Sequence, residues 1–264
     1  MDKIRFFKMH GCGNDYIFVD EREGKAEDPS ALAVKICDRH FSVGGDGLVV
    51  VSPSEVSDCK MRIFNADGGE AETCGNALRC VAMHIFSAEG KNSVAIETAS
   101  GTRKAKIASG KVSVDMGRAV FRADNLPPVG IFAFNFEGRD LFFSAVSVGN
   151  PHAVCFVEDY GFDLSRVAAE VGARGFFPQG ANVEFLREKG DLLQMRVIER
   201  GSGETLCCGS GACAAAAVAV RSGIKKPGKI AVECAGGRVE VEVKPDFSLI
   251  LTGPAEYAFK GELL

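Results

Sequence analysis

The sequence predicts an α/β (α+β) protein of two similar domains, because one pattern occurs twice along the chain. Residues 61–74 read MRIFNADGGEAETC, and 134 residues later residues 195–208 read MRVIERGSGETLCC. Each copy runs from an apolar strand pattern through a polar, glycine-bearing loop to a cysteine, and an alanine-rich helical pattern follows. Glycine-rich turns recur elsewhere at offsets of 134 to 136 residues. We therefore expect a tandem duplication of one strand-rich unit with a central helix.

In the first half of the chain, β-branched and aromatic runs alternate with glycine turns. The spacing of apolar residues predicts one helix over 31–39, capped by Asp28 or Ser30, and a second over 75–87 after a loop at 65–73. The expected strands are residues 5–9, 16–19, 48–51, 61–64, 93–97, 103–108 and 111–115.

Residues 118–130, which contain Asp-Asn-Leu-Pro-Pro, break the pattern and are the expected linker. The domains are accordingly predicted to be residues 1–118 and 119–252. Helices are expected from Asp163 to about Val171 and over 209–221. The expected strands of the second half are residues 141–148, 183–186, 195–198, 229–234, 238–243 and 249–251.

Composition limits the classes of partner. A formal net charge of −4 and a pI near 5.7 do not indicate the excess of basic residues that is typical of nucleic-acid-binding proteins. The N-terminal residues lack an apolar stretch of signal-peptide length, and the apolar run 212–220 is too short to span a bilayer, so a cytoplasmic protein without membrane contact is expected. The ten cysteines include no CxxC pair and the four histidines lack paired spacing, so no metal site is expected.

Cys74 and Cys208 occupy equivalent places in the repeat, each at the expected start of a helix and each followed by glycine. The positive end of a helix dipole favours thiolate. The backbone N–H groups of residues 75, 76, 209 and 210 form two possible cradles for a carboxylate. One cysteine at a helix start is more often a packing residue, but a matched pair predicts two half-sites.

Inverting a stereocentre needs a base on one face of the carbon and an acid on the other, and a thiolate with a thiol supplies both. Nucleophilic catalysis needs only one cysteine, so it does not explain the pair. The sequence shows no lysine signature for pyridoxal phosphate, and no cofactor is expected. Binding of the carboxylate by helix dipoles and exclusion of water would stabilise the carbanion-like state.

The chain resembles the diaminopimelate epimerase family over nearly its whole length. The resemblance rests on the ordered segments Gly11-Cys-Gly-Asn-Asp15, Asn65-Ala-Asp-Gly68, Cys74-Gly-Asn76, Gly149-Asn-Pro-His152, Asn182, Glu199-Arg-Gly201, Cys208-Gly-Ser-Gly-Ala-Cys213 and Thr252-Gly-Pro-Ala255. It implies two β-barrel-like sheets, each around a central helix, with a cleft between the domains and a tail of residues 253–264 that returns to the first. It also implies interconversion of LL- and meso-diaminopimelate in lysine and peptidoglycan synthesis, without cofactor or metal.

The resemblance also assigns roles to individual residues. Cys74 and Cys208 match the two acid/base cysteines, and His152 and Glu199 match residues that support catalysis. The positions that match substrate contacts are Asn14, Asn65, Gly75, Asn76, Asn150, Asn182, Glu199, Arg200, Gly209 and Ser210. Among these, Arg200 would meet the distal carboxylate of the substrate and Glu199 its ammonium group. Phe259 falls where an aromatic residue supports dimer contact in some relatives, so a homodimer is expected.

Two alternatives stay open. A relative with the same two cysteines could racemise histidine or proline, although proline would leave Asn65, Asn182 and Arg200 without a distal head group to bind. A phenazine-type isomerase of similar fold would lack the cysteine pair. A thiol redox sensor or binding protein could instead use Cys74 and Cys208 as a cross-link, and would exchange no α-hydrogen of any amino acid.

Overall fold

The structure, a computed structural model, describes residues 4–22, 26–71, 74–128 and 130–263. These residues form two compact units. Unit 1 consists of the chain up to Asp115 and the segment from Thr252 onward, and unit 2 is the contiguous segment Met116–Leu251. None of the helices among the described residues is long and apolar enough to cross a membrane.

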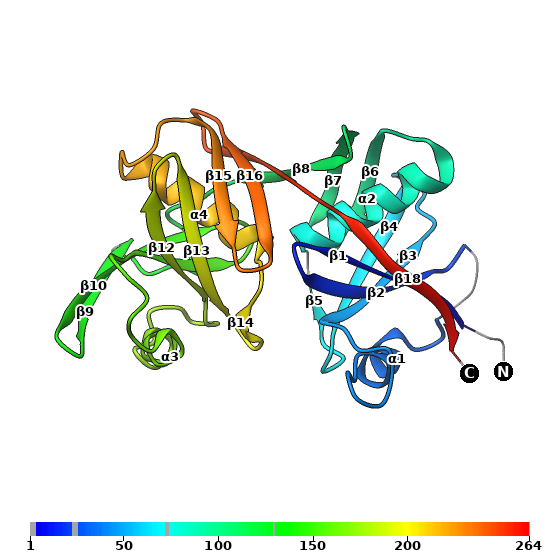
Figure 1. Cartoon of the computed structure of the whole chain (residues 1–264), viewed down its shortest axis with the longest axis horizontal. Helices are drawn as coiled ribbons and strands as arrows, with labels where there is room; N and C mark the ends of the chain where they lie inside the picture. The colour runs from blue at the N-terminus through cyan, green and yellow to red at the C-terminus, as the bar shows by residue number, and fades with distance from the viewer. Residues whose placement is uncertain (1–3, 23–25, 72–73, 129, 264) are drawn as a thin grey trace. The chain divides into compact units, whose positions relative to one another are not determined.

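Unit 1 contains two helices and a set of strands that pair around them (Figure 1). Its elements are β1 Ile4–Gly11, β2 Asn14–Asp20, α1 Pro29–Ile36, β3 Gly47–Ser52, β4 Cys59–Asn65, β5 Glu70–Ala71, α2 Gly75–Glu89, β6 Ser93–Thr98, β7 Gly101–Ala108, β8 Lys111–Arg118 and β18 Glu256–Leu263.

Unit 2 has the corresponding elements, except that the counterpart of its first strand, β9, is the last strand of unit 1, β18. The elements of unit 2 are β9 Ile131–Phe136, β10 Arg139–Ser147, β11 Pro151–Phe156, α3 Leu164–Ala173, β12 Asn182–Lys189, β13 Leu192–Glu199, β14 Gly203–Thr205, α4 Gly209–Arg221, β15 Gly228–Cys234, β16 Gly237–Val243 and β17 Ser248–Gly253.

The strand pairings confirm the predicted duplication. In unit 1, β18, β1 and β2 pair antiparallel in turn, β2 pairs parallel with β3, β3 pairs antiparallel with β4, and β4 pairs with both β5 and β6. In unit 2, β9 through β15 repeat this scheme with the same directions at every step. Because pairing direction and order agree throughout, the two units share one topology.

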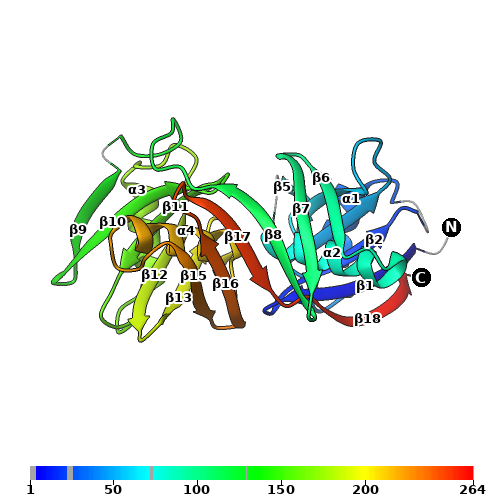
Figure 2. The same ribbon diagram turned by 90° about the horizontal axis from the view of Figure 1, so that it is seen from above.

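The long helix of each unit is enclosed by strands. All residues from 75 to 82 of α2 and from 211 to 219 of α4 are buried, whatever side of the helix they lie on. A helix that is apolar all round is stable only when its whole circumference is covered. The alanines and glycines of α4 have small side chains, so strands can approach the helix closely. Six strands contact it: β10, β11, β12, β13, β15 and β16. Figure 2 shows α4 among these strands from a second direction. The expected central helices are therefore confirmed.

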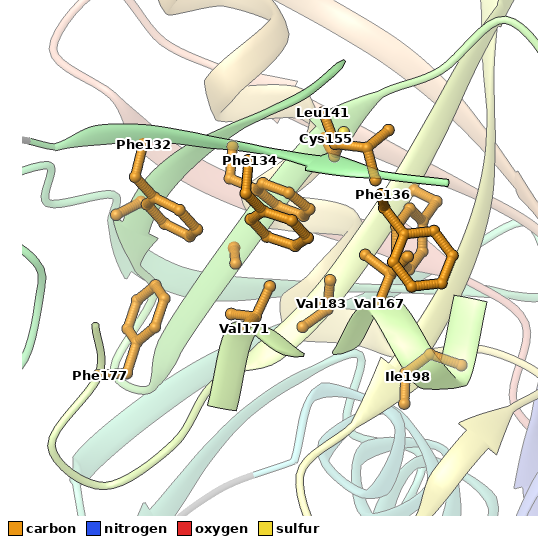
Figure 3. Close-up of a cluster of buried hydrophobic side chains, with 14 of the residues drawn as sticks. Phe132, Phe134, Phe136, Leu141, Cys155, Val167, Val171, Phe177, Val183 and Ile198 are labelled. Atoms are coloured by element: carbon orange, nitrogen blue, oxygen red, sulfur yellow. The ribbon is translucent and has the colours of Figure 1, made fainter. Parts of the chain in front are cut away.

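A second core lies on the other face of each sheet, under the shorter helix. In unit 2, Phe132, Phe134 and Phe136 alternate with exposed residues along β9. They face Val167 and Val171 of α3, an arrangement that Figure 3 shows from the side. The rings of Phe132 and Phe134 each stack on Phe143, with centroids 5.2 and 5.4 Å apart. Burying several phenylalanines contributes on the order of 2 kcal/mol each.

The β1–β2 hairpin turns at Cys12 and Gly13, where the sequence predicts a glycine turn. Both residues have a positive φ, 57° and 80°, which a two-residue turn requires when it follows the strand twist. Gly13 adopts this conformation without strain, whereas Cys12 is a side-chain-bearing residue in the left-handed region. The turn sets the register in which Asn14 opposes Gly11 and Tyr16 opposes Met9.

The C-terminal strand β18 belongs to unit 1. It pairs antiparallel with β1 from Glu256 opposite His10 to Leu263 opposite Ile4. Two strands, β8 and β17, carry the chain between the units, and they pair with each other. The hydroxyl groups of Ser113 and Thr252 lie 2.8 Å apart on these two strands.

Several elements differ from expectation. The first helix begins at Pro29, capped by the side chain of Asp28, and ends at Ile36 rather than residue 39. The expected loop 65–73 contains β5, and residues 72 and 73 lie outside the described part of the chain. Strands β9, β11, β14 and β18 follow none of the predicted strand ranges. The division between the units falls inside β8, before the expected linker, and Val120 of that linker forms an isolated bridge with Ser147.

Candidate active site

Cys74 is the N-cap residue of α2, in an extended conformation that allows the helix to begin at Gly75. Its carbonyl oxygen accepts the first helical hydrogen bond, from the N–H of Leu78 at 2.9 Å. The N–H groups of Gly75 and Asn76 lie in the first turn, where the helix itself offers no acceptor. Donors of this kind at the positive end of a helix dipole suit a bound carboxylate.

The sulfur of Cys74 has a donor and an acceptor beside it, both on β2. The hydroxyl group of Tyr16 donates a hydrogen bond to Sγ over 3.4 Å. The thiol in turn faces Oδ1 of Asn14 at 3.9 Å, the longest of these contacts. Asn14 and Tyr16 are two residues apart on one strand, so their side chains leave the same face of the sheet.

Two neighbours fix the orientation of the Asn14 amide. Its Nδ2 donates to Oδ2 of Asp46 at 2.7 Å, and its Oδ1 accepts from Nδ2 of Asn76 at 2.8 Å. Only the carbonyl oxygen therefore faces Cys74. Burial and the nearby Asp15 carboxylate raise the pKa of Asp46.

Arg79 is fully buried in α2 and supports the same cluster from behind. Its guanidinium donates to Oδ1 of Asn76 at 2.8 Å, to the carbonyl of Pro254 at 3.1 Å and to that of Gly75 at 3.4 Å. Gly11 makes room for it, because a Cβ there would lie 2.7 Å from the guanidinium nitrogen. Arg79 thus connects the helix start to the segment that leads into β18.

In unit 2, Cys208 is the N-cap of α4 in a matching extended conformation. Its carbonyl accepts from the N–H of Ala212 at 2.9 Å, and its Sγ accepts from the N–H of Gly211 at 3.3 Å. Ser210 Oγ lies 3.5 Å from the same sulfur. The N–H groups of Gly209 and Ser210 occupy the first turn, as those of the equivalent residues do in unit 1.

Two carboxyl groups, those of Glu199 and Glu184, lie near the Cys208 sulfur. Burial raises the pKa of this thiol well above its ordinary value, and the negative charges of Glu199 and Glu184 raise it further. The pKa of Glu199 is also raised, first by burial, although hydrogen bonds with the hydroxyl of Thr205 and with Cys208 oppose the shift. Burial and both carboxyl groups thus disfavour the thiolate form of Cys208.

His152 lies in the same cluster and has no exposed surface. Its Nε2 lies 3.1 Å from Oδ1 of Asn150, an acceptor, so Nε2 carries a proton. Its Nδ1 lies 2.7 Å from Oε1 of Glu184. The same carboxylate oxygen would lie 2.8 Å from a Cβ at position 211, which explains the glycine there.

The residues expected to hold the distal end of a substrate are Asn182, Arg200 and Asn65. Oδ1 of Asn182 accepts from the backbone N–H of Arg200 at 2.9 Å. The exposed Arg200 side chain donates to the carbonyl of Gln179 at 2.7 Å and covers Gly180, which has a positive φ of 74°. Asn65 is exposed at the end of β4.

Within each unit, then, contacts join predicted site residues. Asn14 and Asn76 lie with Cys74, while Asn150, His152, Glu199 and Ser210 form the network around Cys208. Asn182 joins Arg200, and Asn65 has no contact with either cysteine cluster among the described interactions.

Sequence reasoning missed four members of these clusters: Tyr16, Asp46, Arg79 and Glu184. One of them had a signal, because Tyr16 precedes His152 by 136 residues, the offset that also relates Asn14 to Asn150. The other three are recognised only when distant strands and helices are brought together.

All ten cysteines are present as thiols. Among the residues that the structure describes, no three histidine, cysteine or carboxylate side chains are grouped closely enough to hold a metal ion.

A family model described as diaminopimelate epimerase matches residues 6–122 and 144–258. The chain is 41% identical to the diaminopimelate epimerase of Acetivibrio thermocellus over 281 residues, which cover 98% of each chain. It is 40% identical to that of Methanococcus maripaludis strain C5 over 276 residues, covering 98% of this chain and 99% of the relative.

Solved structures share the fold at low sequence identity. A hydroxyproline epimerase from Agrobacterium vitis, solved with trans-4-hydroxy-L-proline, matches with a TM-score of 0.76 and 15% identity, covering 99% of this chain and 92% of the other. A PhzF-family phenazine biosynthesis protein from Bacillus anthracis matches with a TM-score of 0.75 and 19% identity over the whole of both chains.

Proposed function

This chain belongs to the diaminopimelate epimerase family, and on that premise we propose that it interconverts LL- and meso-diaminopimelate, a step of lysine and peptidoglycan synthesis. The observation that carries the proposal is the repeated arrangement of Cys74 and Cys208. Each is the extended N-cap of a buried helix, and each is followed by glycine and first-turn N–H donors. An enzyme that uses one nucleophile would need only one such arrangement.

In the proposed reaction, both cysteines act on one α-carbon. A thiolate removes the α-proton and becomes a thiol, while the other thiol delivers its proton to the opposite face and becomes a thiolate. The product has inverted configuration, and the two sulfurs have exchanged protonation states. No electron is gained or lost, so the step balances without another reactant.

The developing charge on the α-carbon spreads into the carboxylate, which the helix starts would stabilise. We assign this role to the backbone N–H groups of Gly75, Asn76, Gly209 and Ser210. Asn14 in unit 1 and Asn150 in unit 2 are assigned as further contacts of the substrate. Asn14 is held by a hydrogen bond from Asn76, and Asn150 by one with His152.

The second amino-acid head of diaminopimelate requires its own contacts. We assign its carboxylate to Arg200, whose guanidinium is exposed, to Asn182, whose side chain accepts from the Arg200 N–H, and to Asn65 of unit 1. Glu199, with its carboxyl group beside Cys208, would take an ammonium group. These contacts favour diaminopimelate over proline, which has no second head.

The test is proton NMR of the reduced enzyme in heavy water with LL-diaminopimelate, and in parallel with L-histidine and L-proline. We expect loss of one diaminopimelate α-hydrogen signal as the meso isomer appears, and no exchange in the other two. Exchange of histidine or proline alone would refute the substrate assignment. The absence of all exchange under reducing conditions would favour a thiol sensor.

Variants test the two-cysteine mechanism. Cys74→Ala and Cys208→Ala are each expected to abolish epimerisation while retaining the circular-dichroism spectrum of the parent protein. As a matched control, Cys155→Ala removes a buried thiol of β11 that lies in the outer core of unit 2, and should retain turnover. Normal turnover by either of the first two variants would refute the mechanism.

We also propose that the protein is a homodimer that works in a reducing compartment, the cytoplasm. The ten thiols support the compartment. Phe259 of β18 supports the dimer, because its ring is 48% exposed while its edge packs against Phe6 at a centroid distance of 6.0 Å. Light scattering should give twice the chain mass, and Phe259→Glu should reduce it to one chain.

A further inference from the structure

Tyr16 and His152 occupy equivalent places in the two units. Each lies on the strand that pairs antiparallel with its predecessor and parallel with its successor, β2 in unit 1 and β11 in unit 2. Each follows an asparagine by two residues, in Asn14-Asp-Tyr16 and Asn150-Pro-His152. The duplication has thus placed a phenol in unit 1 where unit 2 has an imidazole.

Packing holds the Tyr16 ring in place. The residue is only 8% exposed, and its ring lies over Gly47 of the neighbouring strand β3. A Cβ at position 47 would lie 3.0 Å from the ring and 2.6 Å from the carbonyl of Phe64, so only glycine fits beneath it. Phe18 packs edge-on, with ring centroids 6.4 Å apart and ring planes at 69°.

The two partners of the Cys74 sulfur differ in what they can do. The Asn14 amide is oriented by Asp46 and Asn76, so it presents only its carbonyl oxygen and can accept a hydrogen bond from a thiol. The Tyr16 hydroxyl presents a donor at 3.4 Å. A donor hydrogen bond is stronger when its acceptor is charged.

Acidic side chains lie near the Cys208 sulfur. Burial raises the pKa of that thiol and the nearby Glu199 and Glu184 raise it further, although hydrogen bonds with Ser210 and the Gly211 N–H oppose the shift. A carboxylate disfavours a nearby thiolate, whereas a phenol donor favours one. The carboxyl groups near Cys208 therefore disfavour a thiolate there, whereas the Tyr16 hydroxyl favours one at Cys74.

We propose that the Tyr16 hydroxyl is a hydrogen-bond donor to the reacting sulfur, which stabilises Cys74 as the thiolate and makes it the resting base of the enzyme. The assignment of Cys74 as a base rests on the function proposed above. The hydrogen bond itself, and its effect on the thiol, do not depend on which amino acid is the substrate.

Tyr16→Phe removes one oxygen atom and retains the ring. The matched control is Tyr160→Phe, which removes a hydroxyl that donates to the carbonyl of Gln194 at 3.1 Å, in unit 2. The first readout is the rate of alkylation of the Cys74 peptide by iodoacetamide between pH 6 and 10, followed by mass spectrometry so that each cysteine is scored separately.

In Tyr16→Phe we expect the midpoint of Cys74 alkylation to rise by about one pH unit, because a hydrogen bond to a charged acceptor is worth about tenfold in an ionisation equilibrium. The midpoint in Tyr160→Phe should match that of the parent. An unchanged midpoint in Tyr16→Phe, with the melting temperature retained, would overturn the proposal. If Tyr16→Phe does not fold, Tyr16→Met takes its place in the experiment. Methionine fills similar apolar space without a hydroxyl group, so this variant should shift the Cys74 midpoint in the same direction.

The second readout is the pH profile of diaminopimelate turnover. In Tyr16→Phe, kcat/KM at neutral pH should fall about tenfold and recover as the pH is raised past the shifted midpoint, with KM unchanged. A fall that is independent of pH would indicate a structural role and overturn the proposal. The two proposals can fail separately. If the alkylation midpoint shifts but the parent protein does not turn over diaminopimelate, the Tyr16–Cys74 hydrogen bond is supported and the proposed epimerase function is refuted.

Discussion

His152 and Glu184 form a hydrogen-bonded pair in which neither side chain has any exposed surface, with Nδ1 and Oε1 2.7 Å apart. On the other side of the ring, Nε2 lies 3.1 Å from Oδ1 of Asn150, so both ring nitrogens of His152 have a polar partner. The pair joins β11 to β12 directly beneath the start of α4.

Removing one member of this pair should destabilise the protein. We expect Glu184→Ala to lower the free energy of unfolding by about 3 kcal/mol, because a buried imidazole loses its partner. Glu184→Gln should cost less, since an amide N–H can still donate to Nδ1. Urea unfolding followed by circular dichroism measures both. Glu188→Ala on the same strand, an exposed partner of Lys225, should change stability by less than about 1 kcal/mol, and equal effects at the two positions would contradict the pairing.

Gly211 and Gly172 are both helical glycines, but their surroundings differ. A methyl group at 211 would lie 2.8 Å from Glu184 Oε1 and 3.3 Å from Cys208 Sγ, whereas at 172 it would meet nothing within 4 Å. Gly172→Ala should therefore stabilise the protein by up to about 1 kcal/mol through helix propensity. Gly211→Ala should destabilise it and lower kcat at least tenfold, because Glu184 must move. A Gly211→Ala enzyme with parental kcat would show that the cluster is not rigid.

Arg79 is expected to be important for the stability of unit 1. Arg79→Met leaves acceptors on Asn76, Pro254 and Gly75 without their donor, and we expect a loss of about 3 kcal/mol in the free energy of unfolding. The control is Arg5→Met, which removes an exposed arginine paired with Glu262 at 3.4 Å and should cost less than about 1 kcal/mol. Equal denaturation midpoints for the two variants would contradict the role of Arg79.

Stability should fall at alkaline pH because buried thiols resist ionisation. Burial raises the pKa of Cys59, Cys80 and Cys155 to about 12, and that of Cys37 to about 11. Below an ordinary thiol pKa of about 8.5, both states are protonated and these groups favour neither state. Above it, the unfolded chain releases protons that the folded protein retains, so the free energy of unfolding decreases as pH rises.

Each such thiol contributes a slope of about −1.4 kcal/mol per pH unit between its unfolded and folded pKa. Urea unfolding at intervals from pH 8 to 11 measures the total. Cys155→Ala should make the slope shallower by about one thiol's share above pH 9, and an unaltered slope would contradict the burial effect at that residue.

How far the sequence predicts this fold depends on whether a segment carries a local signal. The helix 209–221 was placed to the residue, because Cys208 and the run of small residues mark its start and its length. Strand β11 was missed because Pro151-His-Ala-Val-Cys-Phe156 is buried on both faces and has no polar alternation. Strand β18 was missed because six of its eight residues are exposed, so its place depends on pairing with β1 rather than on a hydrophobic face.

The same distinction applies to the site. Cys74 and Cys208 are visible in the sequence because the repeat aligns them. Glu184 is not, since its place beside His152 depends on the parallel register that sets Val154 opposite Glu184 and His152 opposite Asn182. Arg79 is likewise hidden, because a charged residue in a helix ordinarily lies on a solvated face.

The pairing of β18 with β1 has a consequence for the order in which the protein forms during translation. Unit 2 is one contiguous segment and can fold as soon as Leu251 has left the ribosome, whereas unit 1 lacks a strand until the residues after Thr252 emerge. Until then β1 has an open edge, and Arg79 lacks the carbonyl of Pro254. The part of the chain that is made first is therefore the part that is completed last.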